Sequence, residues 1–413
     1  MIPNTDKNTR ALLLGMIDHM SDEETLEELK LLAETAGAET VGEAVQKRNK
    51  IDPAYYIGRG KAEEVSAAVE SLGANAVICD DELSPVQIRN LENLTGVQII
   101  DRTMLILDIF AQRAKTSEGK NQVELAQLQY MMPRLTGKGI ELSQEGGGIG
   151  TRGPGETKLE TDRRHIRRRI HRLKRELEDI QRSRQVITKS RMYPVISLVG
   201  YTNAGKSTLM NALTDADVKT GNRLFETLDT TTRGLILPDE RKVLLSDTVG
   251  FIRKLPHHLV EAFKATLEEV READMLIHVA DSSNPVLEEE IATVNSVLKE
   301  IGADKKPIII AINKIDKNGE ERIFMKGYDK NSIIGISALS GQNIDKLLAA
   351  ICRILPSDRQ QAELLIPYDN GPALNEVHQH GFIDVIEYKD NGVKLKGSID
   401  IATLKKYEKY MIK

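Results

Sequence analysis

The chain has 413 residues, which is more than one hydrophobic core usually serves, so we expect about two to four domains. Its net charge of −5 argues against a generally basic nucleic-acid-binding surface, and an aromatic content of 4% with no Trp argues against broad base-stacking platforms. Cys79 and Cys352 lie far apart with no CxxC motif, so neither a zinc site nor a disulfide framework is expected. No apolar run approaches the roughly 20 residues of a membrane span, and the N-terminus lacks a signal-peptide pattern. We therefore expect a cytoplasmic protein.

Residues 1–118 alternate short apolar runs with amphipathic stretches. The runs predict strands at 11–17, 76–79 and 97–100, and the stretches predict helices at 22–35, 61–72, 85–94 and 103–113. Strand followed by helix, repeated, favours an α/β domain with a mainly parallel sheet.

Residues 119–192 carry apolar side chains at helical spacing on both sides of a glycine-rich stretch. The two series are Leu125, Leu128, Met132 and Leu135, and then Leu159, Ile166, Ile170, Leu173, Leu177 and Ile180. Two such segments predict an antiparallel helical hairpin. The connection, 137–155, contains eight glycines. It is either a flexible connector or a small-residue tip that enters a crevice in folded RNA.

The second helix of this hairpin is strongly basic. Residues 163–175 contain eight Arg or Lys and no acid, whereas a merely solvated helix usually mixes signs. Because the apolar stripe faces the partner helix, the charges crowd onto the other face and favour a nucleic-acid partner. A solvated face is the alternative, and a membrane surface fits less well because the apolar stripe is narrow. The predicted RNA contacts are Arg152, Arg163, Arg164, Arg167, Arg168, Arg169 and Arg172.

Residues 193–357 form a second predicted α/β unit, with strands at 195–199, 243–245, 275–280, 308–312 and 333–336. Residues 358–413 are predicted to form a small α+β domain. Within it, apolar strands at 382–388 and 393–397 flank a hairpin turn that includes Gly392.

The first strand of the second unit runs directly into a phosphate-binding loop of the form GxxxxGK[ST]. Its glycines let backbone N–H groups wrap a β-phosphate, Lys206 should bridge the β- and γ-phosphates, and the Ser207 hydroxyl should bind Mg²⁺. The predicted nucleotide-binding residues here are Gly200, Tyr201, Thr202, Asn203, Ala204, Gly205, Lys206, Ser207 and Thr208.

Three further motifs follow later strands and predict a guanine nucleotide. Asp247 can hold Mg²⁺ through water, and the Gly250 N–H can meet the γ-phosphate. The Asp316 carboxylate suits the N1–H and N2 amine of guanine and repels adenine, and a backbone N–H after the last strand can reach guanine O6. All of them lie at strand C-terminal ends, where open α/β sheets bind ligands. The segments are Asp247, Thr248, Val249 and Gly250; Asn313, Lys314, Ile315 and Asp316; and Ser337, Ala338 and Leu339.

A threonine-rich segment lies between the first two motifs. GTPases need one threonine there to close over Mg²⁺ and the γ-phosphate, and Thr227, Thr230, Thr231 and Thr232 compete. Phe251 stands where Ras-like enzymes carry a water-orienting Gln. Because a phenyl ring cannot orient water by hydrogen bonding, we expect slow basal hydrolysis and stimulation by a partner. Alternatively, Phe251 simply packs against a neighbouring helix.

Nearly the whole chain resembles the HflX family of ribosome-associated GTPases. The resemblance rests on IGRGKAEE at 57–64, DRTMLILDIFAQRA at 101–114, GGGIGTRGPGETKLETDRR at 146–164, GYTNAGKSTLMNAL at 200–213, FETLDTTTR at 225–233, DTVGFIRKLP at 247–256 and NKID at 313–316. It implies an N-terminal α/β domain, a helical linker, a GTPase domain and a short C-terminal domain. It also implies binding to the large ribosomal subunit and its ribosomal RNA, and separation of stalled or idle ribosomes into subunits, often under stress.

The resemblance also assigns residues. It places the Mg²⁺-closing threonine at Thr227, within a nucleotide-binding segment of Phe225, Glu226, Thr227, Leu228 and Asp229. The expected catalytic groups are thus Lys206, Thr227 and Gly250, with Ser207 and Thr227 as Mg²⁺ ligands. A hydrophobic residue at position 251 is normal in this family.

Some members also hydrolyse ATP, but the turn at 58–61 is too short a signal to place such a site. We expect a monomer. The alternative function is a GTP-dependent switch that binds a structured RNA or a regulatory protein without splitting ribosomes.

Overall fold

The computed structural model describes residues 9–17, 23–47, 50–135, 158–189, 193–214, 231–248, 250–252, 254, 264–318, 332–355 and 359–412. Its contacts divide the chain into two compact units, Met1–Leu235 with Val243–Ile344, and Ile236–Lys242 with Asp345–Lys413. The finer division into four domains stays a prediction.

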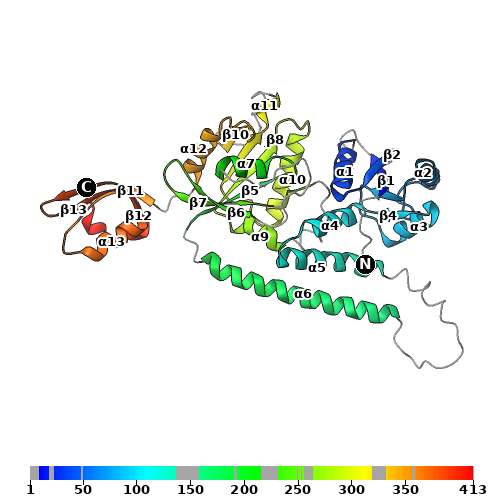
Figure 1. Ribbon diagram of the computed structural model, residues 1–413, viewed down its shortest axis with the longest axis horizontal. Coiled ribbons are helices and arrows are strands. Elements are labelled where there is room, and N and C mark those ends of the chain that lie inside the picture. The colour runs from blue at the N-terminus through cyan, green and yellow to red at the C-terminus, as the bar shows by residue number, and fades with distance from the viewer. Residues whose placement is uncertain are drawn as a thin grey trace. The chain divides into compact units, whose positions relative to one another are not determined.

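The N-terminal part of the first unit is an α/β layer structure (Figure 1). Strands β1 (Arg10–Ile17), β2 (Glu39–Lys47), β3 (Ala76–Cys79) and β4 (Gln98–Ile100) form a sheet of order β2-β1-β3-β4, and each neighbouring pair is parallel. The helices are α1 (Glu23–Ala36), α2 (Arg59–Leu72), α3 (Pro85–Thr95) and α4 (Arg102–Arg113). The predicted parallel α/β fold is confirmed.

Two hydrophobic clusters cover the two faces of this sheet. On one face Leu13 packs with residues of α1 and α4, such as Leu29 and Ile106. On the other face Leu12 packs with residues of α2 and α3, such as Val65. Because successive side chains of a strand point to opposite faces, one apolar strand serves both clusters.

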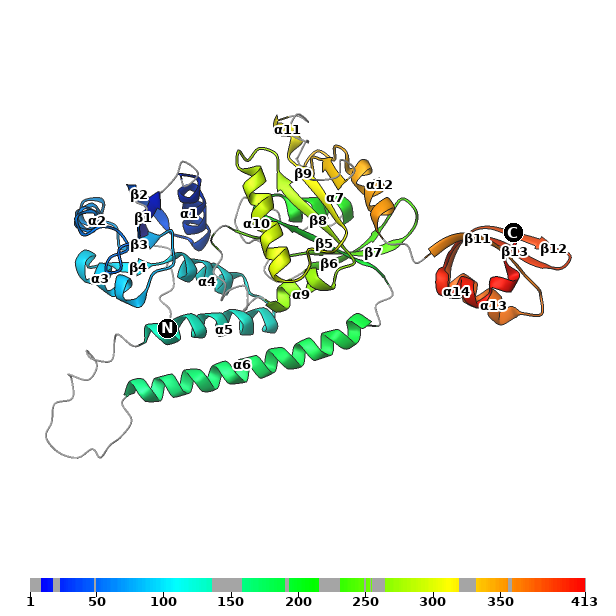
Figure 2. The same cartoon turned by 180° about the vertical axis from the view of Figure 1, so that it is seen from behind.

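A helical hairpin follows, with α5 (Ser117–Arg134) and α6 (Lys158–Lys189) side by side in both views (Figures 1 and 2). Leu125 of α5 packs against Ile170 and Leu173 of α6. The apolar stripe predicted from the heptad spacing therefore lies between the helices. The glycine-rich stretch 137–155 lies outside the described residues.

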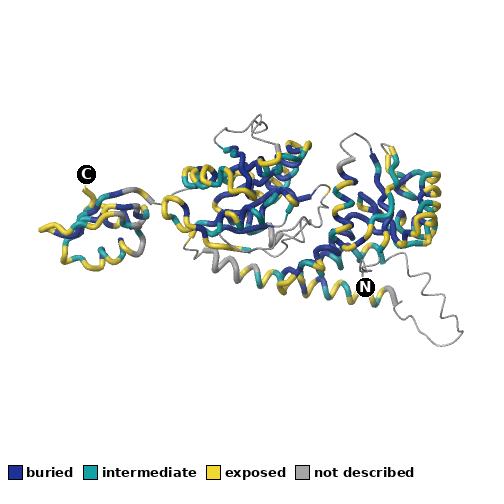
Figure 3. The backbone as a smooth tube through the Cα atoms, turned by 45° about the horizontal axis from the view of Figure 1, so that its top comes forward, coloured by how far each residue is buried: buried dark blue, intermediate teal, exposed yellow. Residues whose placement is uncertain are grey.

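The second sheet has six strands in the order β10-β9-β8-β5-β7-β6, and its central strands are buried (Figure 3). The pairs β10·β9, β9·β8, β8·β5 and β5·β7 are parallel. This arrangement confirms the predicted mainly parallel sheet. Its strands are β5 (Val195–Gly200), β6 (Thr231–Ile236), β7 (Lys242–Asp247), β8 (Met275–Asp281), β9 (Ile308–Asn313) and β10 (Ile333–Gly335). The helices along the same segment are α7 (Lys206–Thr214), α9 (Lys264–Glu272), α10 (Leu287–Glu300), α11 (Ile315–Asn318) and α12 (Ile344–Ile354).

The C-terminal part of the second unit is a small α+β structure. Strands β11 (Arg359–Ile366), β12 (Gly381–Lys389) and β13 (Gly392–Asp400) form an antiparallel sheet of order β11-β13-β12. Helices α13 (Gly371–His380) and α14 (Ile401–Lys406) and a 3₁₀ turn (Glu408–Tyr410) complete it. Strands β12 and β13 pair on either side of the hairpin turn that was predicted to include Gly392, and Gly392 itself, at the start of β13, pairs with Lys389.

Among the helices of the described residues, none is both long enough and apolar enough to cross a bilayer.

His278 on β8 is a buried histidine at the centre of the second sheet. It is 1% exposed, and burial, together with the nearby Lys206 charge, lowers its pKa to about 3. In the unfolded chain a His binds a proton below about pH 6.5, whereas buried His278 stays neutral in the folded protein. The free energy of unfolding therefore falls as the pH decreases.

We therefore predict that His278→Leu makes unfolding less sensitive to acid. Between pH 7.5 and 5.0 the wild type should lose about 2 kcal/mol of unfolding free energy relative to the variant, which urea titrations at each pH would measure. The matched control is His165→Leu on the exposed part of α6, which should follow the wild-type profile. Parallel wild-type and His278→Leu curves would contradict the prediction.

Candidate active site

The phosphate-binding loop connects buried strand β5 to helix α7. Gly205 closes the loop with φ +96, and a Cβ there would lie 2.2 Å from Nδ2 of Asn313. Only glycine combines this backbone conformation with so close an approach. The helix begins at Lys206, so its first free N–H groups point into the loop, as phosphate binding requires.

Lys206 is held over the loop rather than in solvent. Its side chain is nearly buried, and Nζ donates to the carbonyls of Gly200 at 3.0 Å and Tyr201 at 2.8 Å. Burial lowers the pKa of Lys206 to about 8, although the carboxylates of Asp247 and Glu290 oppose the shift. A phosphate anion beside Nζ would stabilise the charged ammonium of Lys206, so the surroundings of this side chain favour the binding of an anion.

Two of the residues predicted to hold Mg²⁺ meet between helix α7 and strand β7. The Ser207 hydroxyl donates to Oδ2 of Asp247 at 2.7 Å, and Asp247 is 1% exposed. A hydroxyl and a carboxylate are hard oxygen donors of the kind that Mg²⁺ prefers, and their position beside the phosphate loop fits the metal. Ser207 would bind it directly and Asp247 through water.

The base-binding motif is tied to the phosphate loop through one amide. Asn313 at the end of β9 is 3% exposed. Its Nδ2 donates to the Ala204 carbonyl at 2.9 Å, and its Oδ1 accepts from the Ala338 N–H at 2.9 Å. The predicted phosphate loop, NKID motif and Ser337–Leu339 turn therefore converge on this side chain, and the Ala338 N–H that could reach guanine O6 is engaged by Asn313.

Lys314 makes a second connection on the same edge. Its Nζ donates to the Asn203 carbonyl at 2.9 Å and to Asp281 at 2.6 Å. The Ile315 N–H donates to the Ile336 carbonyl at 3.3 Å, and Asp316 is exposed at this edge. Sequence reasoning missed Asp281, although its position directly after β8 is the same strand-end signal that found the other motifs.

Phe251 is a core residue. It is 3% exposed and packs with Val199 and Val270, which agrees with the packing alternative considered for it. Its backbone pairs with the phosphate loop: the Phe251 N–H donates to the Gly200 carbonyl at 3.1 Å, and its carbonyl accepts from the Thr202 N–H at 2.8 Å. The segment after Asp247 is thus fixed to the loop, but it offers no polar side chain at position 251.

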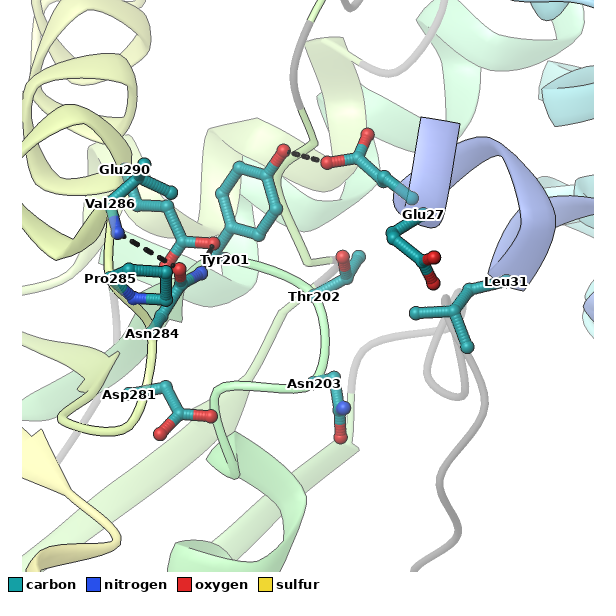
Figure 4. Close-up of a pocket in the computed structure, with 11 residues that line it drawn as sticks. Glu27, Leu31, Tyr201, Thr202, Asn203, Asp281, Asn284, Pro285, Val286 and Glu290 are labelled. Carbon is teal, nitrogen blue, oxygen red and sulfur yellow. Dashed lines mark hydrogen bonds between the residues drawn. The ribbon is translucent and has the colours of Figure 1, made fainter. Parts of the chain in front are cut away.

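The N-terminal layer touches the phosphate loop directly. Tyr201 and Ile252 belong to the same hydrophobic cluster as Leu105 and Ile106 of α4. The Tyr201 hydroxyl donates to Glu28 of α1. A cavity of about 240 Å³ lies beside this contact, and Figure 4 shows Tyr201, Thr202 and Asn203 on one side of it and Glu27 and Leu31 of α1 on the other.

A buried guanidinium organises this contact. Arg102, 1% exposed, donates to Glu28 and, at 2.7 Å, to Asp80. Lys254, which follows the Gly250 segment, pairs with Asp80 at 2.6 Å and with Asp81 at 2.8 Å. The carboxylates of the N-terminal layer therefore hold both the phosphate loop and the segment after Gly250. No motif in the sequence predicted that Glu28, Asp80 and Asp81 would be these partners.

The predicted RNA-contacting arginines differ in their surroundings. Arg164, Arg167 and Arg168 are exposed on α6, and Arg163 is half-buried. Arg169 makes two hydrogen bonds to Glu124 of α5, at 2.7 and 2.6 Å, and Arg172 pairs with Glu176 at 2.9 Å. These two arginines thus have partners within the hairpin. The remaining predicted residues, Arg152, Phe225, Glu226, Thr227, Leu228, Asp229, Thr230 and Val249, lie outside the described part of the chain.

We predict that Asn313→Ala weakens GTP and GDP binding alike. The change leaves the buried Ala204 carbonyl and Ala338 N–H without this partner, at a cost of about 1–3 kcal/mol each. Fluorescent-nucleotide titration should show at least a roughly tenfold loss of affinity for both nucleotides. Asn90→Ala, which removes a similar 3.0 Å amide–carbonyl bond on α3, is the control and should bind nucleotides as the wild type does. Unchanged affinity in Asn313→Ala would refute the role assigned to this amide.

Comparison with known proteins identifies this chain as a GTPase. Three family models match: "GTP-binding GTPase N-terminal" over residues 23–111, "GTP-binding GTPase Middle Region" over 113–191 and "50S ribosome-binding GTPase" over 195–314. The GTPase HflX of Caldanaerobacter subterraneus is 49% identical over 98% of this chain and 94% of its own length, and that of Escherichia coli K12 is 46% identical over 92% and 90%. A solved GTP-binding protein of Sulfolobus solfataricus in complex with GDP is 29% identical, covers 84% of this chain and 98% of its own, and has a TM-score of 0.46. The chain belongs to the HflX GTPase family.

Proposed function

We propose that this protein binds the large ribosomal subunit in its GTP-bound state and separates stalled or idle ribosomes into subunits under stress. Its basal GTP hydrolysis is slow, the ribosome stimulates it, and hydrolysis releases the protein. The observation that carries the proposal is the pairing of a guanine-nucleotide site with an exposed arginine face on α6. The cytoplasm is the location that this partner requires, and the protein acts as a monomer.

Each part of the site has a separate role in nucleotide binding. The phosphate-loop N–H groups and the Lys206 ammonium hold the β- and γ-phosphates, and the Gly250 N–H meets the γ-phosphate. Ser207, Thr227 and, through water, Asp247 would hold Mg²⁺, which when bound neutralises charge on these phosphates. Because position 251 supplies no hydrogen-bonding side chain, the attacking water is poorly oriented until a partner acts. This reasoning supports a slow basal rate.

Guanine selection is assigned to Asp316. Its carboxylate accepts two hydrogen bonds from guanine, and an amide at this position would instead suit the C2 oxo group of xanthine. We predict that Asp316→Asn lowers GTP affinity by at least about tenfold and raises XTP affinity, because a lost charge-assisted hydrogen bond is worth about 1.5–3 kcal/mol. Competition binding with GTP, XTP and ATP would measure this.

Asp345→Asn, on α12, is the control for loss of one carboxylate and should keep the wild-type preference. If Asp316→Asn bound GTP as tightly as the wild type does, Asp316 would not be the residue that recognises guanine.

Ribosome binding is supported by α6 and by one of the matched family models. The matched model of residues 195–314 describes a "50S ribosome-binding GTPase". The α5 contacts of Ile170 and Leu173 leave Arg164, Arg167 and Arg168 on an exposed face of a helix that is fixed on its other side. Such a face can neutralise several phosphates at once without reorganising, which favours RNA over a small anionic ligand.

We predict that the triple variant Arg164→Gln/Arg167→Gln/Arg168→Gln weakens ribosome binding and flattens its salt dependence. Each lost phosphate contact should reduce the slope of log K against log salt by about 0.7–0.9. Co-sedimentation of the GTP-analogue-loaded protein with large subunits at several salt concentrations would measure both effects. Arg182→Gln is the matched control, because Arg182 lies on the same helix and pairs with Asp179 at 3.5 Å.

Sucrose-gradient profiles of intact ribosomes incubated with the protein and a non-hydrolysable GTP analogue test splitting itself. Free subunits in place of intact ribosomes are expected. Salt-dependent binding without dissociation would instead favour a switch that binds structured RNA. No preference of the GTP-loaded protein for ribosomes would overturn the proposal.

A further inference from the structure

The active site needs one more polar group than the motifs provide. Hydrolysis requires a hydrogen-bonding partner for the attacking water, and Ras-like GTPases use a Gln directly after the conserved Gly. In this protein that position is Phe251, whose ring packs in the core with Val199 and Val270. A side chain from another element must therefore supply the contact, or a partner must do so.

Thr202 borders the place where such a contact is needed. A Cβ built on Gly250 would lie 2.7 Å from Cγ2 of Thr202, 2.9 Å from its Cα and 3.0 Å from Nζ of Lys206. Because Lys206 and the Gly250 N–H are the groups that meet the γ-phosphate in this kind of site, the Thr202 side chain forms part of the wall around that phosphate. The backbone fixes it there, since the Thr202 N–H donates to the Phe251 carbonyl at 2.8 Å.

The hydroxyl of Thr202 makes no hydrogen bond to any of the described residues. The residue is 7% exposed, and its Oγ1 is buried without a hydrogen-bond partner there. Such a group costs about 1–3 kcal/mol, whereas Val would fill the same space without this cost. In Figure 4 Thr202 stands on the phosphate loop and faces the cavity bordered by Glu27 and Leu31.

The hydroxyl can reach the phosphate side by a change of rotamer. The methyl group, Cγ2, faces Gly250, and a rotation of about 120° about χ1 moves the hydroxyl into the staggered position that the methyl group held, while the methyl group takes the position of the Cβ hydrogen. A γ-phosphate oxygen or an ordered water at that face would give Oγ1 the partner that it lacks.

We propose that Thr202 is a catalytic residue of GTP hydrolysis, whose hydroxyl holds the attacking water against the γ-phosphate. Oγ1 accepts a hydrogen bond from the water and donates a hydrogen bond to a γ-phosphate oxygen, keeping its own proton throughout. The water oxygen then bonds to the γ-phosphorus, the bond from that phosphorus to the bridging oxygen of GDP breaks, and the water proton passes to the phosphate. GDP and inorganic phosphate leave, and Thr202 is unchanged. This inference rests on the proposed GTP hydrolysis.

Thr202→Val and Thr202→Ser test the hydroxyl at nearly constant shape. We expect the valine variant to lose about 10–100-fold in the single-turnover rate, both alone and with large ribosomal subunits, because a hydrogen bond to the reacting atoms is removed. Its affinity for GTP and GDP should stay within about threefold of the wild type, while its affinity for GDP with aluminium fluoride, which mimics the transition state, falls with the rate. The serine variant should recover to within about threefold.

Thr293→Val on α10, whose hydroxyl donates only locally to the Glu289 carbonyl at 2.8 Å, is the control for the substitution itself. A valine variant with the wild-type rate, an equal loss of ground-state affinity, or a serine variant as slow as valine would overturn the inference. If the valine variant does not bind nucleotide at all, Thr202→Ala takes its place with the same expectations. Failure of the wild type to hydrolyse GTP would instead overturn the proposed function, so the two failures are distinguishable.

Discussion

The nucleotide site depends on the side-chain amide of Asn313. This one buried group donates to the Ala204 carbonyl of the phosphate loop and accepts from the Ala338 N–H. The phosphate loop and the Ser337–Leu339 turn, which come from opposite ends of the second α/β segment, are thereby tied to one side chain. Gly205 is required at the same place, since a Cβ there would overlap the amide. The site is thus largely preorganised, which reduces the ordering that a ligand must impose.

A second constraint is electrostatic and connects this site to the N-terminal layer. Arg102 is nearly inaccessible to solvent and is neutralised by Glu28 and Asp80. The same carboxylates contact Tyr201 of the phosphate loop and Lys254 of the segment after Gly250. Removing one partner of a buried charge cluster leaves the others uncompensated, typically at a cost of about 3–5 kcal/mol. The N-terminal layer therefore forms part of the surroundings of the phosphate loop.

Much of this could be predicted from the sequence because the signals are local. The strand-end motifs fix Lys206, Ser207 and Asp247 by their spacing, and heptad spacing placed Ile170 and Leu173 on the α5 side. Strand β2 was missed because it is an edge strand of half-buried residues without a continuous apolar run. The pairing of Arg169 with Glu124 on the neighbouring helix was not predicted either. Pairings across helices or across 173 residues, as between Tyr201 and Glu28, leave no trace in local patterns.

The order of residues in the charge cluster has a consequence for how the chain is made. Glu28, Asp80 and Arg102 all belong to the first part to be synthesised, whereas Tyr201 and Lys254 follow their partners Glu28 and Asp80 by 173 and 174 residues. The nascent N-terminal layer can therefore neutralise its buried guanidinium from its own residues, whereas Tyr201 and Ile252 join its hydrophobic cluster only afterwards. The later segment then adds to a surface whose buried charges are already paired, so the longest-range contacts are not required for the first folding step.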